Sequence, residues 1–405
     1  MNGDNCGDME AQSMAQAFTN PQPPAGKAMT KIGVVVFDDI WVANGTTVRA
    51  RRVLELLSGN YDITIVSCSK SRGSLERVGL ANVRLINIQY VGMRLLMSRS
   101  LPIPVKLIPI VLWNLRLALV LLRTRFHIVY LVNDWFGFLS AYLVSKVKGY
   151  DTIFEAHAIY SAESKELGHS GLRLKLERAL ERFVVSHSDF VIALSQNTFE
   201  FYQQFTSRIG LVPVFVDTQL FTAGKRPERT ERKLIGLIGP FDAGSVRQRS
   251  SLEFVYARIG EFDSRIDFVV IGRCDDRVEN RRIRYAGYLD SLGDYVGELS
   301  RLDAVLLAEG AATFGPLNKI IEAMSCSVPV FTTPKGMVGL SWVEPGRHIL
   351  VFEEAELVDK VNELIFDAER MREIGRNARN VVEQYYSKKA NAQKLISILH
   401  SMASD

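Results

Sequence analysis

The stretch from residue 304 to 332 constrains the fold of this 405-residue chain more than any other. Residues 304–308 (AVLLA) form a short apolar run typical of a buried strand, and a loop of small residues, 310–315, follows. Proline suits a first helical turn, so the pattern predicts a helix over 316–325 and a second strand over 328–332. Together they predict one βαβ unit of a parallel sheet, in which ligands bind at the carboxyl ends of the strands.

The same stretch carries a motif that is more specific than its periodicity. Gly315 is followed by Asn318, Lys319 and Glu322, then by Ala-Met, and residues 328–330 are Val-Pro-Val. This order resembles the nucleotide-sugar signature of the family 4 retaining glycosyltransferases (glycosyl transferases group 1), and the resemblance extends over nearly the whole chain. It implies an α/β chain with the GT-B fold, in which two Rossmann-like, doubly wound domains face a central cleft.

The resemblance also implies roles for particular residues. Glu322 would bond the ribose hydroxyls of the donor, and a carboxylate suits that task because it accepts two hydrogen bonds from a vicinal diol. No cofactor is implied, since the nucleoside diphosphate-sugar is a co-substrate. The residues expected to hold its diphosphate and sugar lie just before and within the first helical turn: Gly315, Pro316, Leu317, Asn318 and Lys319.

Two positions depart from the family pattern. Phe314 stands where relatives carry a second Glu, so the expected acceptor for a sugar hydroxyl is missing unless Glu309 supplies it. Pro240 stands where relatives carry the Arg that clamps the diphosphate. Because a leaving nucleoside diphosphate develops negative charge, some cation is needed, and Arg247 or Arg249 is expected to provide it.

The first part of the chain repeats the strand and helix pattern. Residues 31–37 and 61–67 predict buried parallel strands, with a helix between them. The loop before that helix contains Gly45, where relatives carry paired glycines near the donor phosphates. Arg49, on the first turn, has two interpretations: it meets an anion, or it is an ordinary exposed surface side chain.

A further strand, predicted over 152–156, ends at His157, and a His in this place faces the ligand crevice. In relatives the matching His lies beside the transferred sugar, so the resemblance makes His157 and Glu322 the expected catalytic residues. A neutral imidazole can bond the sugar 6-hydroxyl. A buried His that is satisfied by its neighbours is the alternative.

The segment after His157 is where acceptor contacts are expected. It contains Tyr160, Glu163 and Glu166. Either Glu166 or Asp134, which follows the preceding predicted strand, could act as a base toward the acceptor.

The span 77–133 contains no Asp or Glu, although many Arg and Lys residues alternate with apolar runs. The uncharged piece 107–115 is far shorter than the roughly 20 residues that cross a bilayer. Such a pattern suits peripheral contact of residues 92–125 with a membrane surface. A core helix with outward-pointing Arg residues is the alternative.

Composition shifts suggest the domain limits. Residues 1–28 predict a disordered leader that is not a signal peptide, because no apolar core region is present. We expect an acceptor-binding domain over 29–222, a polar linker over 223–233 and a nucleotide-sugar-binding domain over 234–385. The last residues, 386–405, predict a helix that crosses back to the N-terminal domain.

The remaining composition excludes other classes. The four Cys residues are scattered, which indicates neither a disulfide framework nor a zinc site and favours the cytoplasm. The adjacent pair Asp275 and Asp276 is not interpreted as a metal site, because GT-B enzymes use helix N-termini and basic side chains instead. A net charge of +4 does not indicate a nucleic-acid partner.

The sequence therefore predicts a metal-independent, retaining hexosyltransferase-type enzyme located in the cytoplasm or on the inner face of the membrane. Its partners would be a nucleotide-sugar donor and a glycan or lipid-linked acceptor in polysaccharide or glycolipid synthesis. Two alternatives stay open. One is a catalytically inactive GT-B homologue that acts as a binding subunit, and the other is a nucleotide-sugar 2-epimerase, against which Phe314 argues.

Overall fold

The computed structural model describes most of the chain: 29–40, 44–68, 83–88, 103–224, 231–241, 249–289, 291–310 and 315–403, with the side chains of 103–106 left out. The predicted leader, Arg247 and Phe314 lie outside the described residues.

The first domain is built on a parallel sheet with the order β3-β2-β1-β4-β5-β6-β7. Its strands are β1 (Lys31–Val36), β2 (Asp62–Ser67), β3 (Arg84–Asn87), β4 (Ile128–Val132), β5 (Asp151–Ala156), β6 (Phe190–Ala193) and β7 (Ile209–Leu211). Its helices are α2 (Gly45–Leu57), α4 (Ile103–Arg123), α5 (Phe138–Lys148), α6 (Tyr160–Glu166), α7 (Gly171–His187) and α8 (Gln196–Tyr202). The order reverses between β1 and β4, which is the arrangement of a doubly wound sheet.

The second domain repeats this plan, with the order β10-β9-β8-β11-β12-β13. Its strands are β8 (Lys233–Ile238), β9 (Ile266–Ile271), β10 (Ile283–Gly287), β11 (Ala304–Leu307), β12 (Val330–Thr332) and β13 (Leu350–Val351). Its helical elements are α9 (Ser250–Arg258), α10 (Leu292–Ser300), α11 (Asn318–Ser325), η3 (Pro334–Met337), α12 (Leu357–Leu364), α13 (Ala368–Val381), η4 (Val382–Tyr386) and α14 (Lys388–Ala403).

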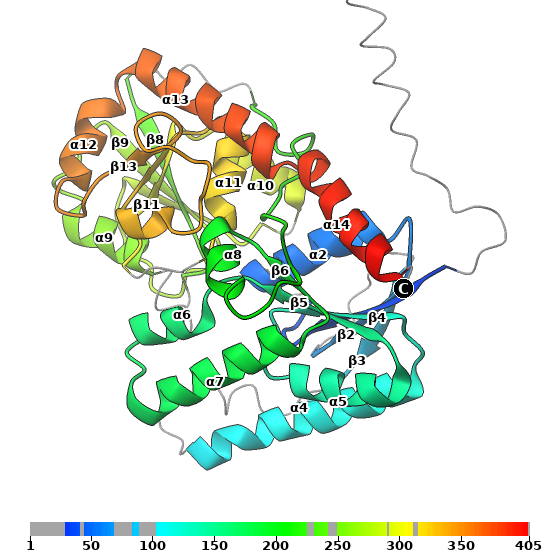
Figure 1. Cartoon of the computed structure of the whole chain (residues 1–405). Helices are drawn as coiled ribbons and strands as arrows, with labels where there is room; N and C mark the ends of the chain where they lie inside the picture. Colours follow the sequence, from blue (N-terminus) through cyan, green and yellow to red (C-terminus); the bar gives the residue numbers. More distant parts are fainter. Residues whose placement is uncertain are drawn as a thin grey trace, which may run out of the picture.

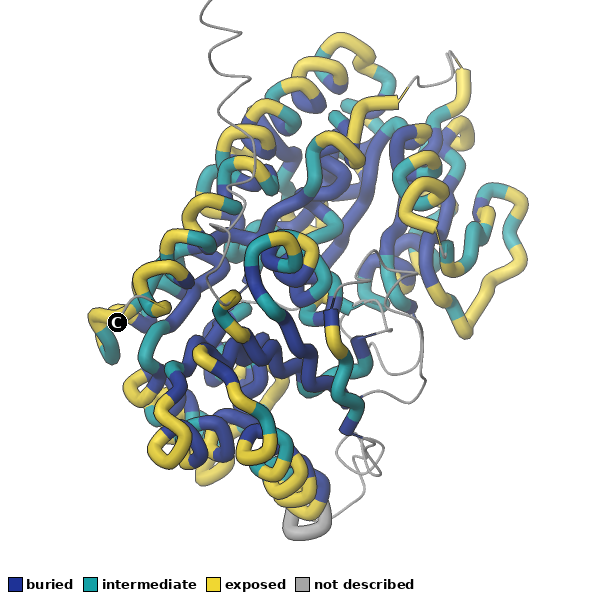
Figure 2. The backbone as a smooth tube through the Cα atoms, turned by 90° about the vertical axis from the view of Figure 1, so that its right-hand side faces the viewer, coloured by how far each residue is buried: buried dark blue, intermediate teal, exposed yellow. Residues whose placement is uncertain are grey.

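Both sheets are covered by helices on both faces, and Figure 2 shows the strands as a buried centre inside more exposed helices. The inner strands are therefore apolar almost throughout; β4, for example, reads IVYLV and is buried at every residue. Continuous apolar strands of this kind are typical of parallel sheets. The two parallel sheets confirm the predicted α/β fold with two Rossmann-like domains.

The helix predicted over 316–325 begins later, at Asn318. Leu317 is extended (φ −84°, ψ 112°) and precedes the first helical residue, so Pro316 belongs to the loop. The preference of proline for the first helical turn predicted a helix that starts at Pro316. The loop between β11 and α11 is therefore two residues longer than predicted.

The chain returns to the first domain at its C-terminal end. Figure 1 shows α14 leaving the second domain and lying near α2. Ser387 bridges Val216, and the Tyr61 hydroxyl lies 3.2 Å from Nδ1 of His400. These contacts tie α14 to the first domain.

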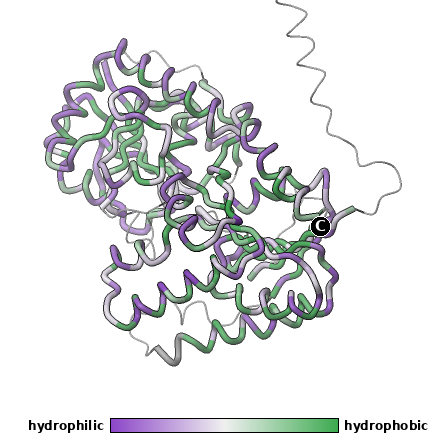
Figure 3. The backbone as a smooth tube through the Cα atoms, in the orientation of Figure 1, coloured by the Kyte–Doolittle hydropathy of each residue, from purple (hydrophilic) through white to green (hydrophobic). Residues whose placement is uncertain are grey.

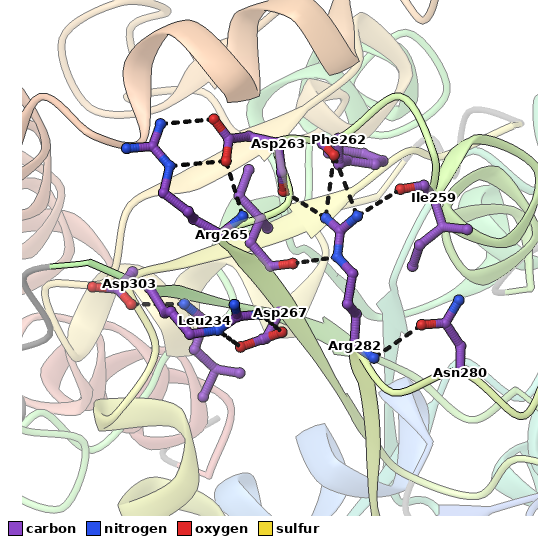
Figure 4. Close-up of polar contacts among 11 residues, drawn as sticks. Leu234, Ile259, Phe262, Asp263, Arg265, Asp267, Asn280, Arg282 and Asp303 are labelled. Carbon is purple, nitrogen blue, oxygen red and sulfur yellow. Dashed lines mark hydrogen bonds and ion pairs between the residues drawn. The ribbon is translucent and has the colours of Figure 1, made fainter.

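The amino edge of the second sheet is held by a cluster of charged and carbonyl groups (Figure 4). The Arg282 guanidinium donates to the carbonyl oxygens of Ile266 (2.8 Å) and Asp263 (2.6 Å). Arg265 forms an ion pair with Asp263 at 2.7 Å. Since ligands of doubly wound sheets bind at the opposite, carboxyl edge, these cations fix the scaffold.

Helix α4 lies at the outer edge of the first domain and is strongly hydrophobic along its length (Figure 3). Among the described residues, none of the helices combines the length and apolar character needed to cross a membrane.

Candidate active site

The carboxyl edges of the two sheets meet at Gly315 and His157. A Cβ atom on Gly315 would lie 2.3 Å from the carbonyl oxygen of His157 and 3.2 Å from Cβ of Ala158. Glycine is therefore required for this close approach, because any side chain would collide with backbone. The donor loop predicted from the motif thus lies directly against the turn that carries His157.

A second contact joins the same loop to α2. Asn44 caps α2 by accepting a hydrogen bond from the Thr47 backbone N–H at 3.0 Å, and Gly45 is the first helical residue. A Cβ atom on Gly45 would lie 4.0 Å from Nδ2 of Asn318. The structure therefore brings Gly45 and Asn318, two of the residues predicted to bind the donor, close together.

Glu322 is held from both domains. Arg52 on α2 pairs with Oε1 at 2.5 Å, and the Tyr295 hydroxyl on α10 donates to Oε2 at 2.8 Å. Arg52 also donates to Oδ1 of Asn318 at 3.3 Å and to the carbonyl oxygen of Phe215 at 3.0 Å. Burial and the adjacent carboxylate raise the pKa of Tyr295, so its hydroxyl stays a donor. Sequence reasoning identified Glu322 but missed both of its partners.

Lys319 points back toward the second sheet. Its Nζ lies 2.7 Å from Oε1 of Glu309 and 3.4 Å from the carbonyl oxygen of Ile238, at the end of β8. Glu309 is buried, and its Oε2 has no hydrogen-bond partner in the part of the chain that is described. Glu309, considered as a substitute for the Glu missing at 314, thus lies next to the predicted donor loop and is paired with Lys319.

Pro316 and Leu317 complete the loop. Gly339 has φ +88°, and a Cβ atom there would lie 2.5 Å from the backbone nitrogen of Pro316. Glycine at 339 therefore allows the following segment to support the donor loop from behind.

Arg249 does not point at this loop within the described structure. Its guanidinium pairs with Asp276 and lies 3.3 Å from Oε1 of Glu253. Asp276 is thus engaged by an arginine. The described residues contain no group of three His, Cys, Asp or Glu side chains arranged to hold a metal ion.

The first domain contributes a buried charge network below His157. Nε2 of His157 lies 2.8 Å from Oε1 of Glu155, which is fully buried at the end of β5. Arg49 donates to Glu155 from Nε and Nη2, the latter at 2.9 Å, and Tyr130 donates its hydroxyl to Oε2. Arg49 also donates to the carbonyl oxygen of Pro213 at 3.2 Å.

This network fixes the protonation of Glu155. Burial by itself raises the pKa of the carboxyl, but Arg49 and His157 outweigh it and lower that pKa to about 2. A carboxylate only accepts, so the His157 ring donates through Nε2 and is held in one orientation. The exposed-surface interpretation of Arg49 is wrong, because only 1% of its side chain is accessible.

A hollow of about 260 Å³ adjoins the His157 turn at the carboxyl edge of the first sheet. It contains three carboxylates and four aromatic rings among its lining residues: Phe37, Asp38, Thr46, Val132, Asn133, Asp134, Trp135, Phe136, Ala158, Tyr160 and Glu163. Tyr160 and Glu163, where acceptor contacts were predicted, therefore line one pocket, which we call the acceptor pocket.

The two carboxylates considered as acceptor-side bases differ. Glu166 is exposed at the end of α6 and does not line the acceptor pocket. Asp134 lines it, but Oδ1 accepts the Gly137 backbone N–H at 2.7 Å and Oδ2 accepts Nε1–H of Trp113 at 3.0 Å. Burial raises the pKa of Asp134 to about 6 against those hydrogen bonds.

Two facing Rossmann-like domains, joined at a glycine loop and a strand-end histidine, define a protein of the GT-B class. Two family profiles match the chain: Glycosyltransferase Family 4 over residues 43–220, and Glycosyl transferase-like over residues 247–397. The chain belongs to the family 4 type of GT-B glycosyltransferases. No curated protein sequence matches it.

Solved structures agree on the fold at low sequence identity. Sucrose-phosphate synthase from Thermosynechococcus elongatus is 13% identical with a TM-score of 0.74, and the match covers 93% of this chain and 99% of that one. HepE from Anabaena, solved in complex with UDP-glucose, is 13% identical with a TM-score of 0.70, covering 92% and 100%. A TarM variant from S. aureus, in complex with fondaparinux, α-GlcNAc-glycerol and UDP, is 12% identical with a TM-score of 0.63, covering 91% and 99%.

Proposed function

We propose that this glycosyltransferase moves a sugar from a nucleoside diphosphate-sugar to a glycan or lipid-linked acceptor, with retention of anomeric configuration, in cell-surface polysaccharide or glycolipid synthesis. The observation that carries the proposal is the contact between Gly315 and the His157 backbone. It joins the predicted donor loop to a histidine whose ring is held by Glu155. HepE and TarM, solved with UDP or UDP-glucose, support a nucleotide-sugar donor.

Each domain then has its own task. Glu322 receives the ribose of the donor, and the loop from Gly315 to Lys319 receives the diphosphate and sugar. Lys319 provides a cation on the first turn of α11, and Arg247, or Arg249 once it is released from Asp276, adds to it. His157 lies against the transferred sugar. Backbone N–H groups and cations that oppose the charge on a leaving diphosphate stabilise the transition state without a metal ion.

Retention needs no protein nucleophile in this scheme. The bond from the anomeric carbon to the diphosphate oxygen breaks, and the acceptor oxygen forms its bond on the same face. The acceptor proton passes to the departing phosphate oxygen, so the charges balance. Closure of the two domains around the donor excludes water and limits hydrolysis.

The donor site can be tested by thermal stabilisation with UDP, GDP, ADP and CMP. A nucleotide at about 100 times its Kd adds about 2.7 kcal/mol to stability. We expect one of the four to do so, and Glu322→Ala to abolish the effect. Glu363→Ala, an exposed change on α12 where Glu363 pairs with Lys360, is the control and should keep it.

The structure adds an observation to Phe314 and Pro240 in favour of the inactive-homologue alternative: protein groups already engage both oxygens of Glu322. Stabilisation by a nucleotide without any donor hydrolysis or transfer would support it. No stabilisation by any of the four nucleotides would remove the donor-site assignment altogether.

We also propose that the enzyme works in the cytoplasm, peripherally attached to the membrane. Within the expected segment 92–125, residues 92–102 lie outside the described structure, but α4 exposes a long apolar face, and α5 beside it extends that face. The exposed apolar side chains are Leu107, Ile108, Val111, Leu112, Leu115, Leu119 and Leu122 on α4, and Leu139, Leu143 and Val147 on α5.

The charges around this face favour an anionic lipid surface. Neither helix contains an Asp or Glu, and the exposed charged side chains nearby are cations: Arg116, Arg123, Arg125, Lys146 and Lys148. Lys148 also donates to the carbonyl oxygen of Leu122 at 2.9 Å, so the two helices form one surface. Each cation near an anionic surface adds about 1 kcal/mol to binding.

Vesicle flotation tests this attachment. We expect the protein to float with phosphatidylglycerol vesicles, and the double change Leu115→Asp, Leu119→Asp to weaken binding at least about tenfold, since each exposed Leu that enters lipid contributes roughly 1.5–3 kcal/mol. The control is Leu172→Asp with Leu176→Asp, two even more exposed leucines on α7. Equal flotation of both double variants would contradict the proposal.

A further inference from the structure

The charged side chains that line the acceptor pocket are all acidic. We propose that it binds an uncharged saccharide ring of the acceptor and excludes a ring that carries an acidic group. This inference rests on the glycosyltransferase function proposed above and specifies its substrate class. It is carried by the size, the aromatic walls and the charges of the pocket.

The size of the pocket suits a single ring. Its volume of about 260 Å³ lies just below the roughly 300–1,000 Å³ of ordinary ligand pockets. One pyranose fits such a hollow, whereas an oligosaccharide extends beyond it. The remainder of a longer acceptor would therefore lie outside.

The walls provide both kinds of contact that a sugar ring needs. The rings of Trp135 and Tyr160 are stacked, with centroids 5.2 Å apart and planes inclined by 21°. Together with Phe37 and Phe136 they offer apolar surface to the C–H faces of a pyranose. Burial and nearby carboxylates raise the pKa of Tyr160 to about 12, so its hydroxyl keeps its proton at neutral pH.

The charges of the lining are all of one sign. Asp38, Asp134 and Glu163 are acidic, and the lining includes no Lys, Arg or His among the described residues. Carboxylates accept hydrogen bonds from sugar hydroxyls. The same carboxylates repel an acidic group that enters the pocket, and partial burial strengthens that repulsion.

Burial already makes ionisation of the carboxyl groups in this pocket unfavourable. Burial raises the pKa of Asp38 and raises that of Asp134 to about 6, and the Asp38 charge adds to the shift of Asp134. Arg49, a buried cation of the same domain, is paired with Glu155 and does not line the pocket. A further negative charge would therefore have no described partner there.

The pocket also lies where an acceptor must be. Ala158 lines it and is the residue whose Cβ a side chain at Gly315 would approach to 3.2 Å. Thr46 lines it on the other side, directly after Gly45, which adjoins Asn318. A ring in the pocket is thus next to the donor loop at two points.

Matched pairs of glycosides test the inference. Binding of 4-nitrophenyl glucoside and glucuronide, and of the corresponding galactoside and galacturonide, is measured by titration calorimetry with the full chain, saturated with the nucleotide that stabilises it. We expect at least one neutral member to bind, and its acidic counterpart to bind at least about fivefold more weakly near pH 7.5.

Two variants separate the pocket from general surface charge. Glu163→Gln removes one lining charge and should reduce the discrimination by roughly threefold or more. Glu166→Gln removes an exposed charge from the same helix, outside the pocket, and should leave the discrimination unchanged. Melting temperatures of both variants check that α6 is intact.

The inference is overturned if neutral and acidic members bind equally, if no pair binds, or if both variants behave like the wild type. Nucleotide stabilisation in the same samples distinguishes this failure from failure of the proposed function. If no nucleotide binds, the glycosyl-transfer proposal itself is contradicted. If a nucleotide binds and an acidic ring is accepted equally, only the charge selection is wrong.

Discussion

The two halves of the active site hold their charged groups in different ways. In the first domain, Glu155 receives Arg49, Tyr130 and His157, all from the same domain and all around one buried carboxylate. In the second domain, Glu322 receives Tyr295 from its own domain but Arg52 from the other one. The contacts around Glu155 are therefore complete without the second domain, whereas those around Glu322 depend on how the two domains are placed relative to each other.

This difference distinguishes an ion pair that is fixed within one domain from an ion pair that depends on closure of the two domains. Glu155 is fully buried, and a buried ion pair with further hydrogen bonds is rigid because breaking it leaves an uncompensated charge. The Arg52–Glu322 pair keeps 14% and 10% of its side-chain surface accessible. We infer that domain opening separates the second pair and leaves the first intact.

The largest expected effect is that of Arg49→Ala. It leaves the Glu155 carboxylate buried without its cation, which costs roughly 3–5 kcal/mol of the free energy of unfolding. Urea denaturation measures this loss. Arg51→Ala, two residues along α2 and outside the network, is the control and should cost far less. A loss below about 1 kcal/mol for Arg49→Ala would show that the network is not a rigid unit.

The second effect is a pH dependence. The pKa of Glu155 is lowered from 4.5 to about 2, so its stabilisation is fully present above pH 4.5 and is lost as pH falls through 2. A shift of this size corresponds to about 3 kcal/mol. We expect the difference in stability between the wild type and Glu155→Gln to shrink across that window. A constant difference from pH 5 to about 2 would contradict the lowered pKa.

Sequence patterns predicted the fold and part of the site for identifiable reasons. Buried parallel strands are often continuous apolar runs, so β4 and β11 were visible in the sequence. Gly315 and Glu322 belong to a local motif on one loop and helix. Features that depend on residues close together in the sequence, such as these strands and this motif, could therefore be predicted.

Contacts between distant residues could not be predicted. Arg49 and Glu155 are 106 residues apart, and Arg52 and Glu322 are 270 apart. One sequence does not show which arginine of α2 meets which carboxylate, and a lone Arg on a helix is usually exposed. Arg249 was equally ambiguous, and the structure pairs it with Asp276.

The third prediction concerns Arg52→Ala, which removes the link between the domains. The pair is partly accessible, so we expect a loss of about 1–3 kcal/mol, smaller than for Arg49→Ala. Small-angle X-ray scattering should show a larger radius of gyration for Arg52→Ala, because the domains are freer to open. Arg49→Ala, measured where it remains folded, should leave the radius unchanged. Equal radii for Arg52→Ala and the wild type would contradict a role in closure.

The smallest expected effect is that of Tyr295→Phe, which removes one hydrogen bond to Glu322 and leaves Arg52 in place. A loss of about 1 kcal/mol is expected. Because both partners hold the same carboxylate, the double variant with Arg52→Ala should deviate from additivity by about 0.5 kcal/mol or more. Tyr295 and Glu322 share a domain, so Tyr295→Phe alone should leave the radius of gyration unchanged. Additive losses would mean that Arg52 and Tyr295 act independently, and Glu322 would then not be the point through which the second domain responds to the first.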